Sequence, residues 1–174
     1  MNRYDSRAGD DAFETFYTRT APSLWGYAAR IGGDSALADD IVQDTFYRYL
    51  NYGRPELPER QRKAFVFKIA SRLLTDSFRR RKTLSLETGE DPGLEGVPIQ
   101  GREALSPDLK RLFAALPPQD RALLWLAYVE GYSHEEIAEM MGLNAKSVKV
   151  LLFRLRGSFA ESLRSKGYGL EEQS

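Results

Sequence analysis

Cationic side chains crowd the C-terminal part of this 174-residue chain, and their spacing suits the binding of an anionic polymer. The basic residues of this segment are Lys146, Lys149, Arg154, Arg156, Arg164 and Lys166. Residues 144–166 carry these six basic side chains against one acidic side chain, a net charge of +5. Such an excess of Lys and Arg is typical of a protein surface that neutralises phosphates. The segment is therefore a candidate nucleic-acid contact.

The same part of the chain carries the end signals of two short helices separated by a turn. Ser133, followed three residues later by Glu136, is a capping box and begins a helix. Gly142 ends that helix, and Asn144 can cap the next one. A short helix, a Gly-containing turn and a basic second helix form the helix-turn-helix pattern, whose second helix enters the major groove. The same pattern occurs in all-helical proteins in which Lys and Arg merely face solvent.

A second basic block lies on a long helix predicted to follow a loop at residues 51–62 and to end near Lys82. Residues 60–82 carry nine basic side chains and one acidic side chain, a net charge of +8. Cations interleaved with aromatic rings suit single-stranded nucleic acid, and Tyr52 in the loop is the candidate base contact. The other rings can equally belong to the core, and a basic helix end is favoured by the helix dipole.

An acidic surface is predicted on a helix at residues 35–51, with Asp34 or Ser35 as its cap. The polar positions off its apolar stripe are Asp39, Asp40, Gln43 and Asp44. The ordinary interpretation is a solvated face, since acids are favoured near a helix start. Paired Asp residues could bind Mg²⁺ in a hydrolase, but no phosphate-cradling loop or nucleophile motif accompanies them. The sequence therefore predicts no catalytic residue, no metal site and no cofactor.

The order of the helical patterns predicts an all-α protein of two small helical domains joined by a flexible acidic linker. We expect the first domain at residues 1–82, the linker at 83–107 and the second domain at 108–174. The linker holds four Gly and three Pro, and no helical period is sustained in it. In the first domain, Pro22 predicts a break, with one helix ending near Thr20 and another beginning at Pro22.

Composition excludes several classes of protein. The chain has no cysteine, so disulfides and thiolate metal sites are excluded, and the single histidine, His134, cannot build a His-rich site. The polar first residues resemble no signal peptide, and no apolar run approaches the ~20 residues of a membrane span. We therefore expect a cytoplasmic protein with no direct membrane insertion.

Three segments, taken in their order, resemble one protein family. They are ALADDIVQDTFYRYL, AFVFKIASRLLTDSFRRRK and LPPQDRALLWLAYVEGYSHEEIAEMMGLNAKSVKVLLFRLR. Together they resemble bacterial sigma factors of the extracytoplasmic-function (ECF) group, which keep only the second and fourth sigma domains. The resemblance runs from Phe13 to about Leu163. It implies a promoter-specificity subunit without chemistry of its own, whose partners are core RNA polymerase, promoter DNA and an anti-sigma factor that can hold it near the membrane.

The resemblance also implies residue roles. The residues implied to bind core polymerase are Asp39, Asp40, Gln43, Asp44 and Phe46. The residues implied to bind the −10 promoter element, where a base is flipped out, are Asn51, Tyr52, Arg60, Arg62, Lys63, Lys68, Arg72, Arg79 and Arg80. The residues implied to read the −35 element are Lys146, Ser147, Lys149, Val150, Arg154 and Arg156. The linker is implied to thread toward the RNA-exit channel of the polymerase.

The chain departs from the family pattern in ways that concern specificity. Leu151 stands where many members carry a basic residue, which leaves fewer polar base readers, and Phe67 stands where Trp or Leu is common. Two other function classes remain: a one-component regulator that dimerises and uses only the helix-turn-helix, and the metal-dependent hydrolase considered above. Transcription with purified core polymerase separates all three.

Overall fold

The structure is a computed structural model that describes residues 7–88 and 107–167. In these ranges every regular element is a helix, so the all-α prediction is confirmed. The chain divides into two compact units at about residue 97, except that residues 139–142 group with the first unit. Most of the linker predicted at residues 83–107 lies outside the described residues.

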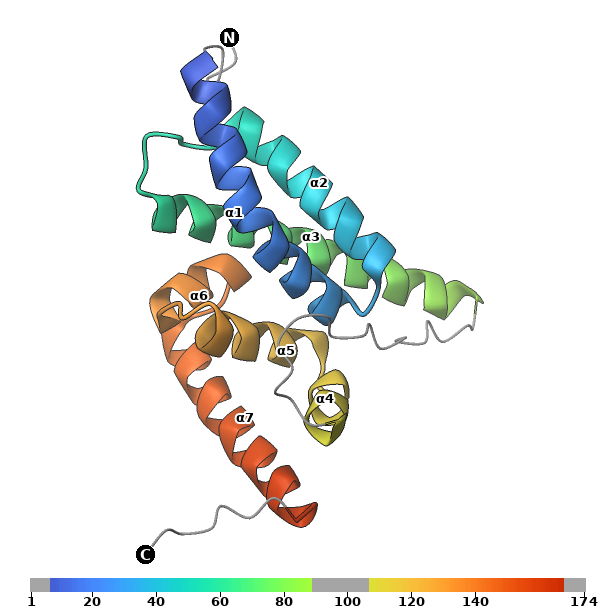
Figure 1. Cartoon of the computed structure of the whole chain (residues 1–174). Coiled ribbons are helices and arrows are strands. Elements are labelled where there is room, and N and C mark those ends of the chain that lie inside the picture. The colour runs from blue at the N-terminus through green and yellow to red at the C-terminus, as the bar shows by residue number, and fades with distance from the viewer. Residues whose placement is uncertain (1–6, 89–106, 168–174) are drawn as a thin grey trace, which may run out of the picture. The chain divides into compact units, whose positions relative to one another are not determined.

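The N-terminal unit consists of α1 (Arg7–Gly32), α2 (Ser35–Tyr52) and α3 (Glu59–Thr88). Figure 1 shows α2 running alongside α1, while α3 crosses both, and each helix packs against the other two. The largest side chains that the three helices bury completely are Leu24, Tyr27, Ile31, Tyr49, Phe67 and Leu74. A hydrogen bond of 2.8 Å between the hydroxyls of Tyr27 and Ser71 joins α1 to α3 inside this core. The unit therefore has its own apolar core.

Pro22 does not break α1, which is a correction to the prediction. The helix is continuous from Arg7 to Gly32 with Pro22 inside it. Proline removes one backbone hydrogen bond, but Phe16, Leu24 and Ile31 on both sides of it are buried on one face. Burial of a single continuous stripe offsets the lost bond, so tertiary packing overrides the local signal.

α3 extends six residues beyond Lys82, to Thr88. The sequence offers no stop signal there, because the first Gly or Pro after Lys82 is Gly89. The first residues assigned to the linker are therefore helical.

The C-terminal unit contains α4 (Pro107–Ala114), α5 (Pro118–Leu124), the short π-helix η1 (Trp125–Val129), α6 (His134–Met141) and α7 (Ala145–Ser165). Leu123, Leu126, Val148 and Leu152 are buried, and α7 packs against α4 and α5. α5 continues into the wider π-helical turn of η1, after which the Glu130 N–H donates to the Trp125 carbonyl at 3.1 Å. Gly131 follows with φ +70°, and this left-handed residue redirects the chain toward α6.

No helix among the described residues combines the length and apolar character needed to cross a membrane.

Candidate protein and nucleic-acid interfaces

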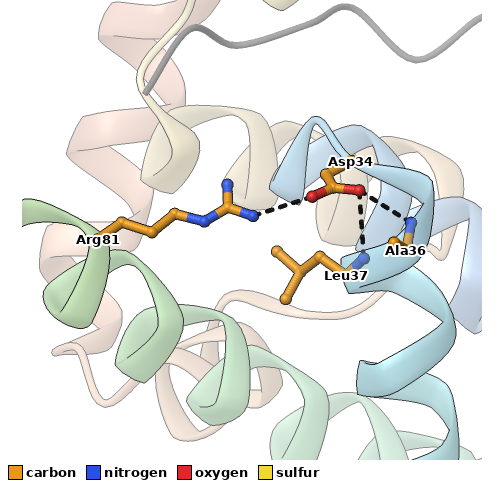
Figure 2. Close-up of polar contacts among 4 residues, drawn as sticks. All are labelled: Asp34, Ala36, Leu37 and Arg81. Carbon is orange, nitrogen blue, oxygen red and sulfur yellow. Dashed lines mark hydrogen bonds and ion pairs between the residues drawn. The ribbon is translucent and has the colours of Figure 1, made fainter. Parts of the chain in front are cut away.

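Asp34 fixes the start of α2, the helix that carries the predicted acidic surface. Its Oδ1 accepts hydrogen bonds from the backbone N–H groups of Ala36 at 2.9 Å and Leu37 at 3.3 Å, as Figure 2 shows. Its Oδ2 accepts a hydrogen bond of 3.2 Å from Nη2 of Arg81, on α3. Of the two caps that the sequence allowed, Asp34 is the one used. The ion pair also ties the start of α2 to the end of α3.

The predicted acidic surface lies on the outward side of α2. Asp39, Asp40 and Gln43 are exposed, and Asp44 is half-buried. Asp44 pairs with Arg48 one turn later at 3.3 Å, while Oδ1 of Asp39 accepts a hydrogen bond of 2.7 Å from the Trp25 indole on α1. The Asp39 carboxylate is thus held at the seam between the two helices.

An open apolar groove of about 1000 Å³ runs along that seam. Its lining comes from α1 and α2 and consists of Phe13, Glu14, Tyr17, Thr18, Ala21, Pro22, Trp25, Asp39, Val42, Gln43, Phe46, Tyr47 and Leu50. Phe46 is only 4% exposed and packs edge-on against Tyr17, with ring centroids 4.7 Å apart. Three of the residues predicted to bind core polymerase, Asp39, Gln43 and Phe46, therefore line one groove.

Sequence reasoning missed the α1 side of this groove. Phe13 and Tyr17 recur at helical spacing with the apolar residues of α1, while Trp25 lies beside that stripe. Their spacing gave a usable signal for an exposed apolar surface. When an apolar stripe is wider than the core can cover, the residues at its edge stay accessible. Only the packing of α1 against α2 shows which members those are.

The residues predicted at the −10 element differ in how freely they project. Asn51, Tyr52, Arg60, Arg72, Arg79 and Arg80 are exposed, and Tyr52 at 76% is among the most exposed aromatic side chains described. Lys68 is half-buried. The Arg62 guanidinium lies 4.6 Å from the centroid of the Phe16 ring, and the Lys63 ammonium lies 5.6 Å from that of Phe67. These two cations lie over core aromatics, an arrangement that stabilises the charge on the ring face.

The end signals of the helix-turn-helix are confirmed atom by atom. The Ser133 N–H donates to Oε2 of Glu136 at 2.8 Å, and the Glu136 N–H donates to the Ser133 hydroxyl at 3.2 Å. Gly142 has φ +67°, which ends α6 in the left-handed region. Oδ1 of Asn144 then accepts a hydrogen bond of 2.9 Å from the Lys146 N–H and caps α7.

α7 presents all the predicted −35 residues to solvent. Lys146, Ser147, Lys149, Val150, Arg154 and Arg156 are exposed, while Val148 and Leu152 are buried on the opposite side. One further residue of this face was missed, Phe153, which is 71% exposed. Its signal in the sequence was its position, three residues after Val150 and four after Lys149, where a helix brings side chains onto one face.

Comparisons with known proteins place both units in one kind of protein. Residues 16–83 match the family model described as Sigma-70 region 2, and residues 107–158 match that of Sigma-70, region 4. The chain is similar to the RNA polymerase sigma factor CarQ of Myxococcus xanthus, with 30% identity over 159 residues that cover 88% of this chain and 90% of CarQ. It is also similar to the ECF RNA polymerase sigma factor SigL of Mycobacterium tuberculosis, with 29% identity over 86% of this chain and 88% of SigL.

A solved structure has the same fold. The sigma factor RpoE of Bartonella quintana, in complex with the anti-sigma factor NepR, superposes with a TM-score of 0.71. The alignment covers 87% of this chain and 96% of RpoE at 23% sequence identity.

Proposed function

We propose a division of labour along this chain, which belongs to the extracytoplasmic-function group of bacterial RNA polymerase sigma factors and is a promoter-recognition subunit of that enzyme. In this proposal residues 1–82 form the domain that binds core polymerase and the −10 element. Residues 108–174 form the domain that reads the −35 element, and residues 83–107 link the two. The chain itself performs no chemistry, because its role is to hold core polymerase and DNA in register.

The α1–α2 groove is the observation that carries the core-binding part of this proposal. An apolar trough with Asp39 in its wall and Asp40 on the next exposed position of α2 complements a helical partner with an apolar stripe and basic flanks. The clamp coiled coil of the largest polymerase subunit is that partner in our proposal. Phe46 forms the wall behind Tyr17 rather than projecting outward, so its contribution is to shape the groove.

The two basic faces bind different forms of promoter DNA in this proposal. On α3, the exposed cations Arg72, Arg79 and Arg80 contact the backbone near the −10 element, while Tyr52 stacks on an unpaired base. On α7, the exposed face enters the major groove of the −35 duplex, where each base pair presents a distinct pattern. Linking two weak DNA contacts through one holoenzyme raises the effective concentration of each.

Regulation by an anti-sigma factor is part of the proposal. The solved relative RpoE is bound to an anti-sigma factor, and its fold matches this chain over most of both lengths. We propose that an anti-sigma factor likewise holds this chain inactive, and that it competes with core polymerase.

Transcription in vitro with purified core polymerase tests the proposed function. Run-off product should appear only when this chain is present. The double variant D40K/D44K should lose core binding in a gel-filtration or fluorescence assay, because reversed charges repel the basic flanks of the partner. The control D76K/E87K makes the same change of net charge at exposed positions of α3 and should bind core normally.

The remaining function classes give different outcomes. Specific binding of duplex DNA by the free chain, with no effect on core polymerase, would instead support the one-component regulator. K149A should weaken promoter binding by the holoenzyme and leave core binding intact, because Lys149 is exposed on α7. Equal loss of both activities in K149A would contradict the separate roles of the two units.

A further inference from the structure

Phe153 is a large apolar side chain at the middle of the outward face of α7. It is 71% exposed, whereas Val148 and Leu152 on the other side of the helix are buried at 0% and 3%. On an α-helix, residues spaced by three, four and seven positions share one line. Lys146, Val150, Phe153 and Gly157 therefore form the centre line of the exposed face, with cations on both sides.

An isolated exposed hydrophobic side chain is ordinary on a protein surface, so the exposure of Phe153 alone is weak evidence for a binding role. The informative feature is the set of side chains around Phe153. Val150, one turn earlier on the same line, is also exposed, so the two make an apolar strip along the centre of the face. Lys149, Arg154 and Arg156 lie on its flanks and are exposed. Such a face carries charges at its edges and apolar groups at its centre.

Gly157 continues this line for one more turn. A glycine in the interior of a helix costs roughly 0.5–1 kcal/mol relative to Ala. Beyond its chain neighbours and the backbone of its own helix, no atom lies within 4 Å of the place where a Cβ would stand on Gly157, so packing inside the protein does not require its small size. A bare backbone at this position lets a ligand approach the helix closely, next to the ring of Phe153.

We infer that Phe153 contacts the 5-methyl group of a thymine in the major groove of the −35 duplex and so determines part of the promoter preference. This inference rests on the proposed role of α7. The thymine methyl is the apolar group that a base pair presents in the major groove, and aromatic side chains are among those that contact it. The flanking cations bind phosphates, which position the helix without reading sequence.

The inference also accounts for the departure at Leu151. Where many relatives carry a basic residue, this chain has a half-buried leucine, and the next exposed positions of the face are Val150 and Phe153. Readout by polar side chains is reduced, and apolar contact with thymine takes its place. The preferred −35 element should then depend on A·T pairs at the positions below Phe153.

Replacement of single thymines by 2′-deoxyuridine tests this contact, because it removes the methyl and leaves the base-pairing groups. The DNA is a promoter selected with the holoenzyme from a pool randomised across the −35 element. Each thymine of both strands is replaced in turn, and the dissociation constant of the holoenzyme is measured. At one or two positions, loss of the methyl should weaken binding by wild-type holoenzyme by about fourfold, the value of one buried methylene-sized group.

The protein variants complete the test. F153A should weaken binding to the thymine promoter by about fourfold or more and become insensitive to deoxyuridine at those positions. F153L keeps an apolar side chain and should keep part of the sensitivity. Y128A removes another exposed aromatic side chain of the same unit and should behave as wild type.

Two outcomes would contradict the proposed contact between Phe153 and a thymine methyl. If no deoxyuridine substitution affects wild-type binding, or if F153A weakens the thymine and deoxyuridine promoters equally, Phe153 does not read a methyl group and the inference is wrong. If the holoenzyme selects no −35 sequence at all, the proposed role of α7 fails, and the inference fails with it. Cooperative thermal unfolding of F153A in the W25F background, where Trp125 reports on the C-terminal unit, shows that the variant is folded.

Discussion

Arg81 donates a hydrogen bond of 3.2 Å to the carboxylate of Asp34, the residue that also caps α2 (Figure 2). One side chain thus satisfies two N–H groups at the start of α2 and anchors α3 across 47 residues of sequence. The helix with the acidic surface and the helix with the basic block are held by the same carboxylate. The stability of this unit should therefore respond to Asp34 in two separable ways.

Substitutions at Asp34 should show graded losses of stability. D34A removes both the cap, worth about 1 kcal/mol, and the ion pair, worth up to about 1 kcal/mol at a partly exposed site. D34S keeps a capping oxygen and should lose only the ion pair. Because the chain has two tryptophans, the variant W125F leaves Trp25 as the fluorescent reporter of the N-terminal unit during urea unfolding. Equal destabilisation by D34S and D34A would show that the cap contributes nothing.

The ion pair also predicts that neighbouring arginines of α3 have different roles. Arg79 and Arg80 are exposed, whereas Arg81 is half-buried and paired with Asp34. R79A and R80A should each lower the salt dependence of holoenzyme binding to promoter DNA, by about 0.7–0.9 in the slope of log K against log salt for each phosphate that is no longer neutralised. R81A should leave that slope unchanged and lower the stability of the N-terminal unit. If R81A reduced the slope of log K against log salt and left the stability unchanged, Arg81 would instead contact a DNA phosphate.

The sequence could predict those features whose signals are local. Ser133 with Glu136, Gly142 and Asn144 define the ends of α6 and α7 because each cap involves residues at most a few positions apart. The outward face of α7 followed from the same helical period. For this reason all six predicted −35 residues are exposed.

Features that depend on packing between distant segments could not be predicted. Pro22 is a local break signal, but the core shared by α1, α2 and α3 keeps the helix continuous. The groove exists only because α1 and α2 lie side by side, so the helical spacing of Tyr17 could not show that it forms part of the groove wall. Arg62 was predicted to face DNA with its basic neighbours, and its place over the Phe16 ring depends on a residue 46 positions away in sequence.

Tyr17 should matter for core polymerase binding. Its ring forms part of the groove wall, and tyrosines are enriched among residues that dominate binding energy at interfaces. Y17A should weaken core binding by about tenfold, measured with fluorescently labelled chain. Y52A removes an equally large exposed ring outside the groove lining, and it should bind core normally while losing affinity for promoter DNA melted at the −10 element. A core-binding defect that is the same in Y17A and Y52A would contradict the assignment of the groove.

Gly157 should show a conflict between stability and DNA binding. G157A adds a methyl that meets no atom within 4 Å beyond its chain neighbours and its own helix backbone, so it should stabilise the C-terminal unit by up to about 1 kcal/mol through the higher helix propensity of alanine. The same methyl lies on the line of Lys146, Val150 and Phe153, so it should weaken binding of the holoenzyme to the −35 duplex by several-fold.

Thermal unfolding of G157A in the W25F background, in which Trp125 reports on the C-terminal unit, measures the change in stability. Titration of the holoenzyme with promoter DNA measures the change in affinity. S158A, at the adjacent exposed position off that line, is the matched control and should leave promoter affinity unchanged. If G157A were more stable and bound the promoter as tightly as wild type, the bare backbone of α7 would have no role at the DNA.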